Sequence, residues 1–495
     1  MKYFRLLFLL ALAVLFAACN DAQADRQAVV RIPQDIAEVG ELSGSLTILA
    51  LGDNTRYNQA LQNLRLYAEL FNGLHPNVEF VFDTYGSLND IADQTALSLR
   101  LMGDPPDIFH TGGSLIWGAD FLEKVNLNAL FIDFHDFFYG PRGIELEGYF
   151  TNIFQAAESQ GGLFRLPFYV EMEVGFLNRR LFDAIGVDWS VISYLTIDEE
   201  IDYFLQIMDV FPDVANLWAY RRFSPWDVLL RESLYNLDTG VVSADTPALQ
   251  SRMERAMQAY RPNRQFMNFT PFAPMPSTYW MSPARLAPHV LTGQSPYMRW
   301  TSLDSGMTTG AVIMMLAGHP QLQFSQPILT LRGGGNVGFS TSQSFSISRN
   351  APNADLAWEF LRFMLEFDES LFTPYRESVD PFAEYTSFGW DNLPVNRARF
   401  ENQLAAIFED VYATVIEFTD LAQHINEDGH KAQTIGRVME FYRGLMERAD
   451  YEIYFNRPVL NSLVYPDFWL LYTNQQDITT TLTNIQNRLE LYVAE

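Results

Sequence analysis

The chain has 495 residues, of which 48% are hydrophobic and 14% aromatic, enough apolar material for two or three domains with buried cores. Charged residues make up 19% and are interspersed, a composition that excludes a disordered chain. The formal charge of -27 argues against nucleic-acid binding, because phosphate recognition relies on surfaces rich in lysine and arginine.

The N-terminus has the layout of an export signal. Lys2 and Arg5 precede an apolar run, and the only cysteine of the chain, Cys19, follows two alanines. A basic start, an apolar centre and small residues before the cut are typical of a signal peptide. The run is shorter than the ~20 residues of a membrane anchor. The cysteine resembles that of the bacterial lipobox, although Phe16 stands where leucine is usual. We therefore expect residues 1–18 to be removed and Cys19 to carry lipid; an ordinary secretory signal is the alternative.

Strand and helix patterns alternate over the next part of the chain. Residues 19–44 are small and polar without a sustained period, and we interpret them as a tether. The patterns that follow predict strands and helices in turn, at residues 46–54, 58–70, 75–85, 88–102 and 108–109. Strand, helix, strand, helix, strand is a βαβ series and indicates a parallel sheet.

Two glutamates lie in a segment with a period of two. Between residues 166 and 177 apolar residues alternate with Glu171 and Glu173, which predicts a strand with both carboxylates on one face. The catalytic carboxylates of a glycosidase must flank a bond. Two carboxylates on one strand face suit accepting hydrogen bonds from hydroxyl groups better. The alternative is that both glutamates lie on a solvent-exposed strand face and have no role in binding.

The second half of the chain is mostly helical. Its patterns predict helices at 178–185, 198–210, 354–367 and 477–493, and a strand at 344–347. Residues 262–300 are rich in proline and aromatic residues and indicate a long irregular insertion. The seven histidines are scattered and Cys19 lies at the processing site, so we expect no metal site. No nucleophile-elbow or phosphate-loop motif occurs, and we expect no cofactor.

Six segments resemble, in order, those of one protein family. They are LTILALGDNTRYN at 46–58, HPNVEFVF at 75–82, LMGDPPDIF at 101–109, the segment 166–187, SFSISRNAPNADLAWEFLRFML at 344–365 and LPVNRARFE at 393–401. The closing helix after PDFW also fits. The family is that of the extracellular solute-binding proteins of ABC importers, in its carbohydrate-type, maltose-binding-protein-like branch. Each motif alone is weak, but six in order are specific.

The resemblance implies an α/β fold of two lobes, joined by crossing strands, with ligand bound in the cleft between the lobes. It places lobe 1 at residues 45–165 and 333–376, and lobe 2 at residues 166–332 and 377–495.

Five ligand-binding residues also follow from the resemblance. Asp53 and Glu171 match cleft carboxylates that accept sugar hydroxyls. Phe223 and Trp226 lie near a cleft aromatic residue in YRRFSPW, and Trp469 matches a stacking tryptophan. A proline-tryptophan turn that relatives often carry is missing here, and the insertions at 262–300 and 371–392 could reshape the cleft. Maltose itself is therefore not carried over.

The resemblance implies a monomeric, non-enzymatic, lipid-anchored component of an ABC transporter that captures a sugar or oligosaccharide. Its partners would be the permease, the ATPase subunits and the membrane, which it meets through the lipid on Cys19. The protein would face outward from the cell membrane or lie in the periplasm. One alternative keeps the fold and binds a peptide, a polyamine or another cation. A less favoured one is a secreted glycoside hydrolase that uses Glu171.

Overall fold

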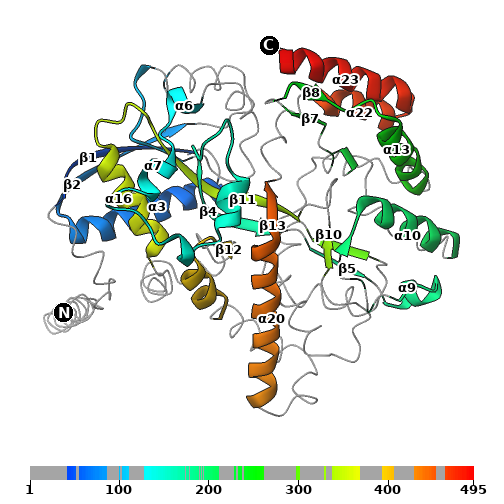
Figure 1. Ribbon diagram of the computed structural model, residues 1–495, viewed down its shortest axis with the longest axis horizontal. Helices are drawn as coiled ribbons and strands as arrows, with labels where there is room; N and C mark the ends of the chain where they lie inside the picture. Colours follow the sequence, from blue (N-terminus) through cyan, green and yellow to red (C-terminus); the bar gives the residue numbers. More distant parts are fainter. Residues whose placement is uncertain are drawn as a thin grey trace, which may run out of the picture.

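The structure is a computed structural model, and it describes many helices and strands of the chain but not every residue. The described residues are 42–51, 55–85, 100, 103–110, 127–210, 228–260, 297–300, 328–330, 337–367, 393–405, 428–452 and 463–494, with gaps of one or two residues within 127–210 and 228–260. Their helices and strands form two groups, with helix α20 (Asp428–Arg448) standing between them (Figure 1).

The first group is built on a seven-stranded sheet. Its strands are β1 (Ser43–Leu51), β2 (Asn77–Tyr85), β3 (Ile108–His110), β4 (Leu166–Met172), β11 (Val337–Ile347), β12 (Leu393–Pro394) and β13 (Ala449–Glu452). Six of them follow the order β12-β4-β11-β3-β1-β2, and β13 pairs with β11. Strands β1, β2 and β3 are parallel, while β11 runs antiparallel to both β3 and β4. Strands β1 to β4 therefore all end at the same edge of this sheet.

Aromatic side chains fill the core of this group. Helix α3 (Thr55–Leu74) brings Tyr67 and Phe71 against Phe363 of helix α16 (Ala354–Glu366), with ring centroids 6.5 and 5.4 Å apart. Trp358 of α16 packs on Phe137, and its indole N–H donates to the Arg142 carbonyl at 2.8 Å. We refer to the buried residues around this sheet as the first core.

The second group has a smaller sheet and a helical core. Strands β5 (Val174–Leu177), β6 (Tyr194–Leu195), β9 (Tyr297–Trp300) and β10 (Ile328–Thr330) follow the order β6-β10-β5-β9. The buried side chains come mainly from helices α10 (Ile197–Val210), α13 (Pro247–Tyr260), α22 (Tyr465–Tyr472) and α23 (Ile478–Ala494). The hairpin of β7 (Tyr235–Asn236) and β8 (Val241–Val242) packs beside α23. We call this cluster the second core.

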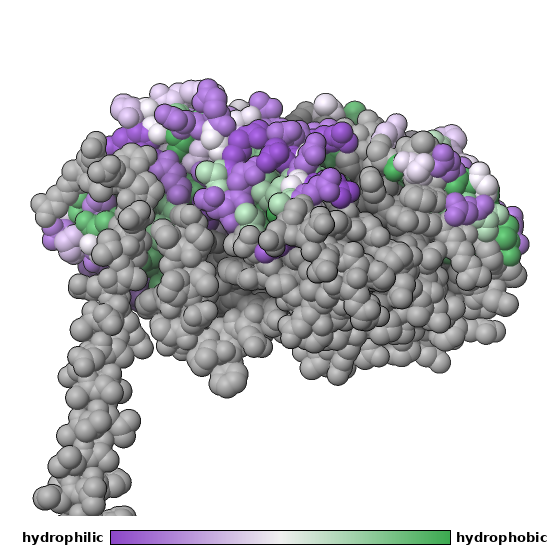
Figure 2. All heavy atoms as spheres, turned by 90° about the horizontal axis from the view of Figure 1, so that it is seen from below, coloured by the Kyte–Doolittle hydropathy of each residue, from purple (hydrophilic) through white to green (hydrophobic). Residues whose placement is uncertain are grey.

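Short helices complete the described elements. They are α6 (Leu127–Leu130), α7 (Phe134–Phe138), the 3₁₀ helix η1 (Leu146–Gly148) and α8 (Thr151–Ala156) in the first group, and α9 (Arg179–Ala184) in the second. Seen from below, the coloured surface residues are mainly hydrophilic (Figure 2). Within the described residues no helix is both long enough and apolar enough to cross a membrane.

Followed from one described element to the next, the chain passes between the two groups three times. It leaves the first sheet between β4 and β5, where a single residue separates the strands, and returns between β10 and β11. It leaves again between β13 and α22. These passages match the crossing strands that the sequence predicts for a two-lobe fold.

Two segments lie with a different group than the sequence analysis placed them. Residues 166–172 were expected in lobe 2, but as β4 they pair with β11 and β12 in the first sheet. Residues 393–405 and 428–449 were also expected there, yet they contribute Phe400, Tyr442 and Met446 to the first core. The boundaries were taken from the family resemblance. Neither the order of the matching segments nor the periodicity of an element shows which core will cover its apolar face, and this is why the boundaries differ.

Candidate binding site

The carboxyl ends of three strands meet at one edge of the first sheet. Ile108 and Phe109 of β3 stand opposite Ile48 and Leu49 of β1, so the two strands end close together. Strand β4 runs in the same direction on the other side of β11. In open α/β sheets ligands bind outside the carboxyl ends of the strands. This edge is therefore the candidate site, and β4 leads from it directly into the second sheet.

Glu171 lies at the point where the chain leaves the first sheet. It is the second-last residue of β4, is half-buried, and stands opposite the buried Ser340 of β11. The first strand of the second sheet begins at Val174, three residues later. The sequence analysis placed Glu171 just after the crossing, whereas it lies just before it. A carboxylate here is at the junction of the two groups and retains some exposure to solvent.

A buried histidine and a glutamine form a second polar pair at this edge. His110 ends β3 and is fully buried; its Nε2 lies 2.5 Å from Oε1 of Gln343 in β11. Burial lowers the pKa of His110 to about 4, with the contact to Gln343 opposing that shift, so the ring is neutral near pH 7. An amide oxygen only accepts hydrogen bonds, and Nε2 must therefore carry the proton.

The sequence analysis did not select His110 or Gln343. His110 follows a predicted short strand directly, and a histidine at a strand's carboxyl end was the available signal. Nothing local to Gln343 indicates that it meets a residue 233 positions away.

Trp469 lies in a row of aromatic rings on the second core. The rings of Tyr465 and Tyr472, about one helical turn before and after it on α22, have centroids 6.2 and 5.5 Å from the Trp469 ring and planes inclined by 30° and 23°. Trp469 is 37% exposed, so part of it is open to solvent. Asp467, on the same helix, is buried and paired with Arg488 at 2.8 Å, so it anchors α22 to α23.

Glu171 and Trp469 thus belong to different groups of the molecule. A ligand in contact with both would bridge the two lobes. Asp53, Phe223, Trp226 and Cys19 lie outside the described residues; β1 ends at Leu51, two residues before Asp53. In the part of the chain that the structure describes, no group of three or more histidine, cysteine, aspartate or glutamate side chains is arranged to hold a metal ion.

Comparison with known proteins agrees with this architecture. The fold is similar to that of the sugar-binding protein MalE from Xanthomonas citri, with 11% identity, a TM-score of 0.55, and coverage of 91% of this chain and 98% of that one. It is also similar to a periplasmic oligogalacturonide-binding protein from Yersinia enterocolitica, with 14% identity, a TM-score of 0.53, and coverage of 91% and 99%. No curated protein sequence matches the chain.

The structures at these identities establish the two-lobe periplasmic-binding-protein fold. The family follows from the sequence itself, because residues 57–366, more than half of the chain, match the family described as bacterial extracellular solute-binding protein. The protein belongs to the bacterial extracellular solute-binding proteins.

Proposed function

We propose that the protein is the substrate-binding component of an ABC importer and captures a sugar or oligosaccharide between its lobes. The observation that carries this proposal is the placement of Glu171 at the junction of the lobes and of a partly exposed Trp469 on the second one. Carboxylates accept hydrogen bonds from hydroxyl groups, and aromatic faces offer apolar surface to a sugar ring. The names of the structural neighbours support the same ligand class.

Ligand capture would work by closure of the lobes. The three chain passages permit one lobe to move relative to the other, and a ligand that contacts both lobes favours the closed form. It can do so only by the difference between its contacts in the two forms. The protein itself performs no chemistry on the ligand. The closed, loaded form would be the one that the permease and its ATPase subunits accept.

The first test is isothermal titration of the purified protein with mono-, di- and trisaccharides, and with amino acids, short peptides and polyamines for comparison. We expect saturable 1:1 binding of one sugar series, with the sugar recovered intact. If only peptides or polyamines bind, the assignment of the fold still holds but the ligand is a peptide or a cation and not a sugar. That alternative is favoured by the charge of -27 and the carboxylate of Glu171.

A substitution at Trp469 tests whether this aromatic residue is part of the site. Trp469→Ala should weaken sugar binding by about 1–3 kcal/mol, the scale of a desolvated aromatic hot spot, without unfolding the protein. Tyr139→Ala is a suitable control, because Tyr139 is a 76% exposed aromatic residue in the first group. Equal affinities of wild type and Trp469→Ala would remove Trp469 from the site.

An enzymatic function makes a different prediction. A glycoside hydrolase would turn over a chromogenic glycoside and lose that activity in Glu171→Gln. The binding protein proposed here releases no chromophore, and Glu171→Gln should only weaken its affinity.

Lipid attachment at Cys19 is a separate part of the proposal. It would hold a strongly acidic body at the outer face of the cell membrane, or in the periplasm, within reach of the permease. Mass spectrometry of the membrane fraction should find a diacylated Cys19 at the mature N-terminus. An unmodified Cys19 would leave an exported protein without this anchor.

A further inference from the structure

Strand β11 extends past the end of β3 at the candidate site. Phe345 of β11 stands opposite His110, the last residue of β3, and the antiparallel pairing continues toward Ile108. Gln343 therefore lies two residues beyond the end of β3. On the other side of β11 it stands opposite Tyr169 of β4, two residues before Glu171. Gln343 and Glu171 thus lie at the same edge of the sheet.

The orientation of the Gln343 amide is determined by His110. The imidazole is fully buried and lies against the Phe345 ring, with centroids 4.8 Å apart and planes inclined by 28°. Phe345 in turn packs edge-on against Phe168 at 4.7 Å. A ring held in this way cannot turn freely, so its Nε2–H holds the oxygen of Gln343 in one direction.

One half of the amide has no partner among the residues that the structure describes. Gln343 is half-buried, and in the described structure its side chain makes a hydrogen bond to His110 alone, through the oxygen. Its NH₂ group carries two donors and has no protein acceptor among the described residues. A long side chain fixed at one end, with unused donors at the carboxyl edge of a sheet, is suited to contact a ligand.

We infer that Gln343 is a further ligand-binding residue, that its NH₂ group donates to an oxygen of the ligand, and that His110 is the residue that positions it. This inference rests on the proposed function and narrows it. Glu171 supplies an acceptor and Gln343 supplies a donor, a pair that suits a neutral polyhydroxyl ligand, whose hydroxyl groups both donate and accept. A protonated polyamine carries only N–H donors, so it offers no acceptor to the NH₂ group of Gln343.

The decisive variant is Gln343→Glu, which keeps an oxygen for His110 and replaces the NH₂ group with an acceptor. Titration with the sugar that the wild type binds should show a loss of affinity of at least about tenfold, because the N–H donor is lost and a charged oxygen must give up its hydration when the ligand binds. The ligand hydroxyl that accepted from the NH₂ group could pair with the new carboxylate only by turning to donate, which removes that proton from its other partner. Thermal unfolding monitors the fold. Gln206→Glu adds the same charge on the exposed face of α10 and should bind like the wild type.

His110 is tested by a double-mutant cycle. His110→Phe retains a ring against Phe345 but removes the donor, and it should weaken sugar binding by about three- to tenfold in the wild-type background. In a Gln343→Met background the same substitution should have no further effect on affinity, because the side chain it positions is gone. An effect of equal size in both backgrounds would show that His110 acts on the structure generally and overturn its positioning role.

The outcomes separate the inference from the function on which it rests. If the wild type binds a sugar and the affinity of Gln343→Glu for that sugar is within about twofold of the wild-type affinity, the inference is overturned and the proposed function stays in place. A wild type that ignores sugars and binds a polyamine overturns both, and Gln343→Glu should then bind the polyamine more tightly.

Discussion

The two cores of the molecule handle polar groups in different ways. In the first core, charged and polar side chains are buried inside the protein: the Arg399 guanidinium donates to the carbonyls of Met364 and Leu365 at 2.5 and 3.1 Å and to the Tyr169 hydroxyl. In the second core, Asp467 is also buried against Arg488, but the larger ion-pair network lies at the surface where helices α10 and α13 meet. Burial makes a polar contact costly to disturb, whereas water and salt weaken one at the surface.

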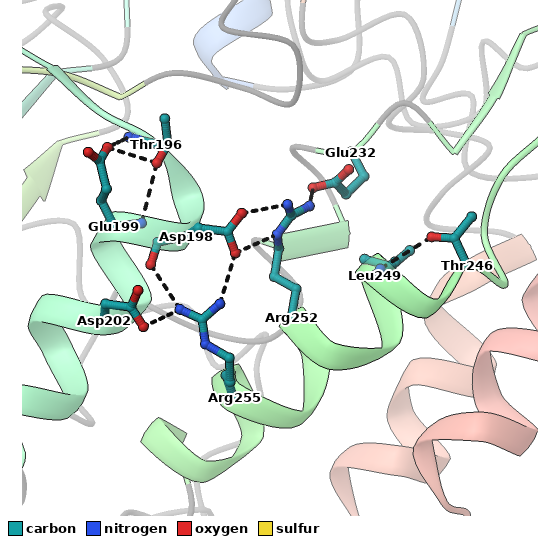
Figure 3. A network of polar contacts seen from close by, with 9 residues as sticks. All are labelled: Thr196, Asp198, Glu199, Asp202, Glu232, Thr246, Leu249, Arg252 and Arg255. Atoms are coloured by element: carbon teal, nitrogen blue, oxygen red, sulfur yellow. Dashed lines mark hydrogen bonds and ion pairs between the residues drawn. The ribbon is translucent and has the colours of Figure 1, made fainter.

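The surface network of the second core is centred on Asp198 (Figure 3). Arg252 of α13 donates to both oxygens of this carboxylate, through Nε at 3.0 Å and Nη2 at 2.6 Å, and also pairs with Glu232. Arg255, one turn further along α13, donates to Asp198 at 3.1 Å and to Asp202. The Asp198 side chain is 43% exposed, so the network holds two helices together without being sealed from water.

The largest expected effect is on the first core. Trp358 is 2% exposed and its ring packs against Phe134, Phe137 and Phe138. Trp358→Ala removes these contacts, creates a cavity and leaves the Arg142 carbonyl without its donor, so we expect a loss of about 3–5 kcal/mol in the free energy of unfolding. Urea denaturation followed by circular dichroism measures it.

The matching substitution in the second core is Phe468→Ala, at a residue that is 3% exposed. Two cores joined by three chain passages are expected to give two unfolding transitions, because multidomain proteins often depart from two-state behaviour. Trp358→Ala should lower the stability of one transition and Phe468→Ala that of the other. If both substitutions shift a single common transition equally, the two cores are one cooperative unit.

The next effect is the acid sensitivity of the first core. Burial lowers the pKa of His110 from 6.5 to about 4. Between these two values His110 is protonated in the unfolded chain but neutral in the folded protein. The free energy of unfolding should therefore fall by about 3 kcal/mol at most as the pH drops from about 6.5 to about 4. Above pH 6.5 and below pH 4 the contribution of His110 should not change with pH. His110→Phe should remove this slope in urea titrations repeated across the range. An unchanged slope would show that another group causes it.

Much of the fold could be predicted from sequence pattern. The strands at 46–54 and 75–85 and the helices at 198–210, 354–367 and 477–493 are confirmed within a few residues at most ends. Their alternating or helical periods are strong and local. The assignment of elements to lobes was less successful, because β4 and α20 carry apolar faces that either core could have covered.

The candidate site could be predicted only in part. Family resemblance pointed to Glu171 and Trp469; the structure places Glu171 near the end of β4 and a partly exposed Trp469 on α22, and their contact with a ligand stays a prediction. The pair of His110 and Gln343 could not be found in this way. It depends on how far β11 extends past β3, and strand stagger is determined by tertiary packing rather than by any local pattern.

The smallest expected effect lies in the surface network of the second core. Asp198→Asn should reduce stability by no more than about 1 kcal/mol in low salt, and by less at high salt, because exposed ion pairs are weak and screened. The hydrogen bond from Arg252, opposed in part by desolvation, lowers the pKa of Asp198 below its usual 3.8. Its contribution is therefore present above that value and lost as the pH falls through the lowered pKa, a window below that of His110. Asp209→Asn, on the exposed face of the same helix, is the control. A loss that persists in 1 M salt would mean that the α10–α13 contact excludes water as the first core does, and the contrast between the two cores would disappear.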